Sequence, residues 1–178
     1  MHNPVMVARF STGYNLVLHS DADGLDPLIS LDGRQSQVAA EIQRGVCRTF
    51  RALGHSVLTE LPLANGRRAD VVGLSSSGDV LIVEIKSCLV DYRTDGKWHE
   101  YLDYCDRLYF AVTMDFPREV IPQDAGLILA DRYGAELARE PAEDRLQAAR
   151  RKAMMLCFAR AAALRLQHHL DPGCGFGS

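Results

Sequence analysis

Long apolar runs and paired cysteines are both missing from this sequence. Its longest hydrophobic segments are far shorter than the roughly 20 residues that a membrane-spanning helix needs. Residues 1–11 contain one arginine and no apolar stretch long enough for a secretory signal, so we expect a protein without a membrane partner. The five cysteines are odd in number and include no CxxC pair, which argues against a disulfide framework or a zinc knuckle. A reducing, cytoplasmic setting is therefore expected.

An excess of positive charge is missing as well, since the formal net charge is −3 at pH 7. Any nucleic-acid site must then be formed by local basic patches. With 178 residues, 47% of them hydrophobic and 24% charged, the chain is typical of a globular protein with a buried core. We expect an irregular N-terminal arm over residues 1–33 with a short strand at 15–18, a single domain over 34–170, and a tail over 171–178.

The spacing of apolar residues predicts an α/β domain. Apolar positions at three- and four-residue steps from 38 to 53 predict a first helix, which ends at Gly54. A helical segment is expected after Gly96, and a long final helix from Pro141 to about His169. Strands are predicted at 57–61, 67–74, 80–86, 108–113, 126–130 and, as a short edge strand, 136–138. The turn-forming residues 75–79 predict an antiparallel hairpin between the second and third strands, and the apolar runs at 108–113 and 126–130 suggest buried parallel strands.

The strand-like run VLIVEIK at residues 80–86 is unusual because it combines apolar residues with two charges. Side chains alternate across a strand, so Glu84 and Lys86 share one face. Burying an isolated charge costs several kcal/mol unless it is paired or bound to a metal. The alternative is an ordinary Glu–Lys pair on a solvated sheet face. The apolar context and the preceding hairpin favour a functional site.

Asp70 lies near the start of the preceding strand, and the turn at 75–79 folds it back toward Glu84. Two converging carboxylates suit Mg²⁺ or Mn²⁺, and the backbone carbonyl of Ile85 is a candidate third ligand. Lys86 would then lie near a scissile phosphate. A metal and an ammonium group together are what phosphodiester hydrolysis needs, so we predict Asp70, Glu84 and Lys86 as catalytic residues.

These residues, in the order Asp70, turn, Glu84-Ile85-Lys86, resemble the PD-(D/E)xK nuclease superfamily. The run RADVVGLSSSGDVLIVEIKSCLVDYRTDGKWHEYLDYCDRLYFAV, followed by GLILADRYGAEL, is similar to the MmcB-like bacterial DNA-repair family, over roughly residues 35–166. The resemblance implies an αβββαβ core with a mixed central sheet, a divalent metal at Asp70 and Glu84, and a role in DNA repair. The sequence departs from the superfamily pattern twice: Ala69 stands where proline is common, and no glutamine occurs between residues 86 and 122.

Further candidates surround this centre. Glu41 on the first helix matches a position where superfamily members often place another acid, although a solvated helix face explains it equally well. Trp98 and Tyr101 could stack on bases, but their helical spacing favours the core. Six cations and no acid occur between residues 145 and 165, which suits either a phosphate footprint or a solvated helix face. The predicted DNA contacts are Arg67, Arg68, Lys97, Arg150, Arg151 and Lys152.

Three functions follow from this pattern. The first is a Mg²⁺- or Mn²⁺-dependent endo- or exodeoxyribonuclease that acts on damaged or structured DNA. The second is a DNA-binding module that keeps the nuclease fold without turnover, which the missing glutamine favours. The third is a scaffold that binds other repair proteins through its arm or final helix. The sequence is compatible with a homo-oligomer in each case.

Overall fold

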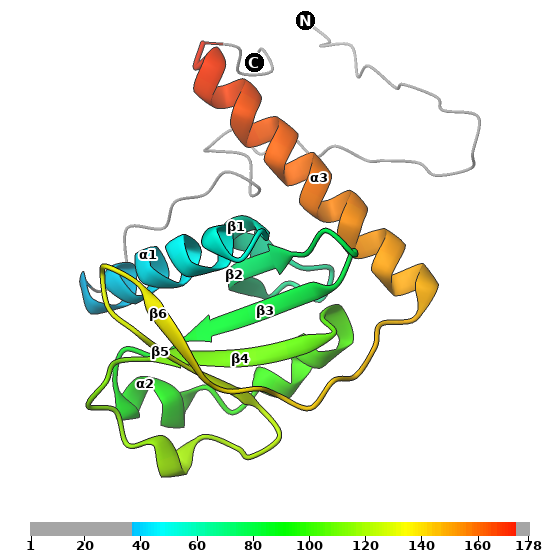
Figure 1. The fold of residues 1–178 in the computed structure, drawn as a ribbon. Coiled ribbons are helices and arrows are strands. Elements are labelled where there is room, and N and C mark those ends of the chain that lie inside the picture. Colours follow the sequence, from blue (N-terminus) through cyan, green and yellow to red (C-terminus); the bar gives the residue numbers. More distant parts are fainter. Residues whose placement is uncertain (1–36, 174–178) are drawn as a thin grey trace, which may run out of the picture.

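The computed structural model describes residues 37–173, and the predicted strand at 15–18 lies outside them. Six strands form one sheet in which neighbours in sequence are neighbours in space (Figure 1). The strands are β1 Ser56–Pro62, β2 Arg68–Leu74, β3 Val80–Ile85, β4 Arg107–Val112, β5 Gly126–Ala130 and β6 Ala135–Arg139. The pairs β3–β4 and β4–β5 are parallel and the other three are antiparallel, so the sheet is mixed, as predicted.

Helices cover both faces of this sheet. They are α1 Gln37–Ala52, α2 Leu89–Thr94, the 3-10 helices η1 Trp98–Tyr104 and η2 Arg118–Val120, and α3 Ala148–Leu170. The helix α1 packs on one face, whereas η1 and the first half of α3 contribute to the core on the other. The order helix, three strands, helix, strand is the predicted αβββαβ core, and the long C-terminal helix is confirmed. None of the helices within residues 37–173 is long and apolar enough to cross a membrane.

The helix α1 follows its apolar stripe. Ile42, Val46 and Phe50 are at most 1% exposed and pack against the sheet. Gly54 ends the helix with φ +84°, a conformation that costs glycine little. Gly45 is required for close approach, because a Cβ there would lie 2.0 Å from the carbonyl oxygen of Asp131.

The strand β3 lies in the middle of the domain, with all six residues buried. It is bordered by β2 on one side and by β4 on the other. Val83 contributes to the core beneath α1, while Ile82 contributes to the core on the opposite face. Glu84, two residues after Ile82, therefore belongs to the face that η1 and α3 cover.

Two predicted elements differ from the structure. The final helix begins at Ala148, not at Pro141. The preceding chain is held extended because the amides of Ala142 and Asp144 donate to the carbonyl oxygens of Asp124 and Asp106. These long-range bonds compete with a first helical turn. The segment after Gly96 is a 3-10 helix, and α2 before it was not predicted.

Candidate active site

Asp70 and Glu84 lie side by side on adjacent strands, as predicted. In the β2–β3 register Val71 faces Val83, so the next residues outward are Asp70 and Glu84. The Glu84 Oε1 atom lies 3.4 Å from the amide nitrogen of Asp70, and the Ile85 amide donates to Asp70 Oδ2 at 2.8 Å. Each carboxylate thus contacts the backbone of the other strand.

The surroundings of this acid pair disfavour negative charge. Glu84 is 3% exposed and Asp70 is half-buried. Burial raises the pKa of Asp70 to about 6, with the charge of Glu60 contributing. Burial and then the neighbouring Asp70 charge raise the pKa of Glu84 well above its ordinary value. Among the described residues Glu84 forms no ion pair, and the charge of Lys86 lowers the pKa of both acids only in part.

Lys86 follows β3 and is 5% exposed. Its ammonium group donates to Asp95 Oδ2 at 2.5 Å, at the C-terminal end of α2. Burial alone would lower the pKa of Lys86, but the hydrogen bond to Asp95 and the charge of Glu84 raise it overall. Lys86 is therefore an ammonium at neutral pH. The burial of Glu84 and Lys86 rules out the alternative of a solvated Glu–Lys pair.

Glu60 is a neighbour of the site that the sequence did not indicate. It lies between Thr59 and Leu61, whose β2 partners Val71 and Ala69 flank Asp70, and its φ of 51° is unusual for a residue other than glycine. Its carboxylate accepts from Gln43 of α1 at 3.3 Å and pairs with Arg68 Nε at 2.6 Å. Gln43 also lies 3.4 Å from the carbonyl oxygen of Asp70. Glu60, Asp70 and Glu84 thus occupy one row across three strands, a feature that only the strand register reveals.

The aromatic residues of η1 belong to the core. Trp98 and Tyr101 are 8% and 4% exposed, so the predicted core placement is right. The Tyr101 hydroxyl donates to the carbonyl oxygen of Arg68 at 3.2 Å. Burial, followed by the negative charges of Glu84 and Asp70, raises the pKa of Tyr101. A neutral hydroxyl therefore closes this side of the acid pair.

Glu41 accepts a hydrogen bond from Gln37 at 3.3 Å on the same helix. One turn of α1 thus supplies a partner for Glu41, and a metal ligand at this position stays a prediction. Residues 37–173 contain no group of three or more His, Cys, Asp or Glu side chains that could hold a metal. The donors brought together are the side chains of Asp70 and Glu84, beside the main chain of Ile85.

The predicted basic residues near β2 are paired with acids. Arg67 Nε lies 2.7 Å from Glu100, and its Nη1 lies 3.8 Å from Asp95. Arg68 is exposed and pairs with Glu60. Lys97 is exposed just before η1, and its backbone amide lies 3.4 Å from Asp95 Oδ1. Acids therefore share the charges of Arg67 and Arg68.

On α3 the structure separates the basic residues into two groups. Lys152 is exposed, and Arg150 is exposed with an ion pair to Asp103. Arg151 instead binds both oxygens of Asp106, at 2.8 and 2.6 Å, and donates to the carbonyl oxygen of Gly78 at 2.7 Å. The prediction of Arg151 as a DNA contact is therefore wrong, because its guanidinium group is committed to the fold.

Asp106 is a buried acid that the sequence did not single out. It is 2% exposed and accepts from the amides of Val80 at 2.7 Å and Leu146 at 2.9 Å. Burial alone would raise the pKa of Asp106, but the hydrogen bonds from Arg151 and these amides lower it overall. This carboxylate joins β3, β4 and the start of α3. Its role is structural.

Fold and site together define a mixed α/β domain with a buried acid, a half-buried acid and a buried lysine at adjacent strand ends. The model of the MmcB-like DNA repair protein family matches residues 26–173, so the chain belongs to this family. A solved protein of unknown function from Silicibacter pomeroyi is 42% identical, with a TM-score of 0.77, over 80% of this chain and 99% of that chain.

A second solved structure has a much weaker similarity to this chain. A repair endonuclease from Pyrococcus abyssi is 17% identical over 51% of this chain and 44% of that chain. Its TM-score of 0.33 is too low for its activity to be transferred. No curated protein matches this chain.

Proposed function

We propose that this DNA-repair family member is a Mg²⁺- or Mn²⁺-dependent deoxyribonuclease whose site is Asp70, Glu84 and Lys86. The observation that carries the proposal is the adjacent acid pair of half-buried Asp70 and buried Glu84, in which Glu84 has no ion pair among residues 37–173. A structural acid in this fold is treated differently, as Asp106 with its arginine and two amides shows. An acid pair left short of positive charge is suited to a bound cation.

The donor set fits a small, hard cation. Carboxylates of Asp70 and Glu84, with the main-chain carbonyl of Ile85, supply oxygen ligands and leave room for water, which Mg²⁺ retains. When bound, the cation would polarise a phosphoryl oxygen and lower the pKa of water. Asp70 is held in place for this role because its Oδ2 accepts the Ile85 amide.

Lys86 would act through its charge. Since Asp95 and Glu84 raise its pKa, it stays protonated and cannot serve as a general base at neutral pH. A fixed ammonium next to the acid pair would stabilise the negative charge that develops on a phosphate. Asp95 would act as a positioning residue, since it holds the ammonium at 2.5 Å.

DNA would be bound by cations near the site and on α3, and the bound metal would assist them. Without a metal the basic residues of the site have little unshared positive charge. The acids are Glu60, Asp70, Glu84, Asp95 and Glu100, and the bases are Arg67, Arg68, Lys86 and Lys97. A DNA phosphate would therefore meet little net positive charge, so a bound divalent cation should strengthen binding there.

One observation favours the second candidate function, a DNA-binding module without turnover. The ammonium of Lys86 is already engaged by Asp95, and a nuclease would have to share it with the substrate. The glutamine missing from the region after Lys86 points the same way. Cleavage assays separate these two functions.

The test is DNA cleavage by the purified full chain on branched, nicked and single-stranded substrates with Mg²⁺ or Mn²⁺. We expect cleavage by the wild type and a loss of roughly 10²–10³ in rate for Lys86→Ala, the usual cost of removing one preorganised electrostatic group. Arg51→Ala, which removes an exposed cation of α1 on the opposite side of the sheet, is the matched control and should cleave at nearly the wild-type rate.

Each other outcome points to a different function. Metal-dependent binding without cleavage on any substrate would identify the binding module. Absence of both cleavage and salt-sensitive binding would leave the scaffold. Equal cleavage by the wild type and Lys86→Ala would place the activity at another site or in a contaminant, and the proposed mechanism would be wrong.

A further inference from the structure

The helix α3 carries two apolar faces, and the domain covers one of them. Met154, Phe158 and Ala161 are buried against the core. A second apolar row lies on the opposite side of the helix, where every member is exposed. We name this row the outer seam; it consists of Leu156, Ala159, Ala163, Leu166 and Leu170. Its steps of three and four residues alternate, which is the a/d spacing of a coiled coil.

The outer seam exposes large side chains that most helices would bury. Leu156, Leu166 and Leu170 are 54%, 58% and 70% exposed. The C-terminal half of α3 projects away from the sheet (Figure 1), so the rest of the described chain does not cover it. An apolar row of this length on a projecting helix is typical of an interaction surface.

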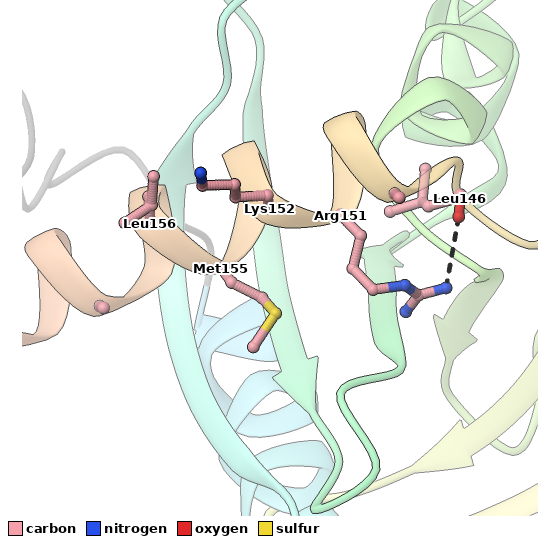
Figure 2. A pocket seen from close by; sticks show the side chains of 7 residues that line it. Leu146, Arg151, Lys152, Met155 and Leu156 are labelled. Carbon is pink, nitrogen blue, oxygen red and sulfur yellow. Dashed lines mark hydrogen bonds between the residues drawn. The ribbon is translucent and has the colours of Figure 1, made fainter. Parts of the chain in front are cut away.

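A shallow groove lies at the other end of the same face (Figure 2). It has a volume of about 610 Å³ and is lined by Leu146, Met155, Leu156 and Ala159, together with Arg151 and Lys152. The seam therefore has projecting leucines at its C-terminal end and a hollow at its N-terminal end. A surface with both features is complementary to a second copy of itself in reversed orientation.

We propose that the outer seam is the interface of a homodimer in which two α3 helices pack antiparallel about a two-fold axis that crosses the seam at the level of Ala161 along the helix. The seam is palindromic about this residue: Leu156 would face Leu166 of the second copy, and Ala159 would face Ala163. Leu170 of the second copy would then lie beside Lys152, at the groove. Such an isologous contact closes the assembly at two chains.

The shape of the molecule selects the antiparallel arrangement. The sheet lies beside the first half of α3, so a parallel pair would bring both domains to the same end, whereas an antiparallel pair separates them (Figure 1). A parallel pair would also place Lys152 against its own copy. The small side chains of Ala159 and Ala163 allow the two helices to approach closely at the centre.

The size and charge of the seam indicate a weak dimer. The paired part of α3, residues 152–170, is about 29 Å long and about 10 Å wide, giving a footprint of roughly 290 Å². A standard interface buries about 800 Å² per partner, so the dimer should depend on protein concentration. Arg160 flanks the seam near the axis, where it would approach the Arg160 of the second copy. Salt should therefore strengthen the dimer by screening this repulsion.

The test is sedimentation velocity of the full chain over a range of micromolar concentrations, without DNA. We expect a concentration-dependent dimer that Leu166→Glu weakens by at least about tenfold, since a buried leucine contributes more than 1.4 kcal/mol. Met114→Glu is the matched control because Met114 is also 58% exposed but lies outside α3. Circular dichroism checks that each variant keeps its fold.

A charge exchange tests the register. The double variant Leu156→Glu with Leu166→Lys should restore the dimer, because each new carboxylate would face a new ammonium of the other copy. A wild type that stays monomeric at every concentration would overturn the proposal and would mean that the arm, DNA or another protein covers the seam. A dimer insensitive to Leu166→Glu, or one not restored by the charge exchange, would refute it equally.

Discussion

Substitution of Asp70 by asparagine should stabilise the cation-free protein at neutral pH, although it removes a residue that we place in the active site. Asparagine has nearly the same shape, and its side-chain oxygen can still accept the Ile85 amide, which lies 2.8 Å from Asp70 Oδ2. The change therefore removes a charge and retains the hydrogen bond. It also relieves Glu84, because the Asp70 charge contributes to the raised pKa of Glu84.

The size and sign of the effect follow from linkage. The pKa of Asp70 is about 6 in the folded protein against an ordinary value of 3.8, so the folded state binds more protons between these values. The free energy of unfolding therefore falls as pH rises from about 4 to about 6, and the loss persists above that range. A pKa shift of about two units corresponds to a loss of about 3 kcal/mol in the free energy of unfolding. Because Asp70 is half-buried, solvent screening reduces the expected loss to roughly 1–2 kcal/mol.

The assay is urea denaturation of the wild type and Asp70→Asn in EDTA at several pH values. We expect the variant to be the more stable one above pH 6 and the two to converge near pH 4. Glu136→Gln, which removes an exposed carboxylate on β6, should show no such crossover. Excess Mg²⁺ or Mn²⁺ should then raise the melting temperature of the wild type, since a cation that binds the folded state stabilises it, and should shift the variant little.

Two results would refute this reasoning. If Asp70→Asn were less stable than the wild type in EDTA at neutral pH, the Asp70 charge would be compensated inside the protein and the site would not be short of positive charge. If metal raised the melting temperature of both proteins equally, the metal would bind somewhere other than the acid pair.

Two further predictions concern the framework of the site. Arg151→Ala should lower the free energy of unfolding by about 3–5 kcal/mol, because it leaves the buried Asp106 carboxylate without its cation. Arg150→Ala, which removes an exposed ion pair, should lower it by less than about 1 kcal/mol. Urea denaturation measures both losses, and equal losses would contradict the structural role of Arg151. Gly45→Ala should lower the melting temperature by several degrees, since its Cβ would lie 2.0 Å from a backbone oxygen, while Gly96→Ala, with open space around it, should change it little.

The strands and the central acid pair could be predicted because their signals are local. The alternation of side chains along a strand depends only on neighbouring residues. The run ending in Glu84 and Lys86 therefore predicted both a buried strand and two charged residues within it. A five-residue turn then brings Asp70 back to Glu84, with no need for distant contacts. The first helix was predictable for the same reason, since its apolar stripe follows the helical period.

The start of α3 and the role of Arg151 could not be predicted, because both depend on Asp106. Asp106 lies 45 residues from Arg151 in the sequence, and nothing in their spacing joins them. An arginine in a basic run has the same local pattern whether it faces solvent or a buried acid. Pro141 likewise has the appearance of a helix start, and only the hydrogen bonds of the extended segment exclude it.

The motif Asp70, turn, Glu84-Ile85-Lys86 identifies the site residues but not the acids that contact or face them. The motif identifies Lys86 but not Asp95, which lies in the loop after α2 and holds the ammonium. It identifies Asp70 but not Glu60, whose place near Asp70 follows from the β1–β2 register. Both missing residues are acids, and each reduces the positive charge that the sequence appeared to offer to DNA. A site with several bases by sequence therefore has little unshared positive charge in the fold. A bound cation would strengthen the attraction of a phosphate backbone to it, so DNA binding at this site and metal binding should be coupled.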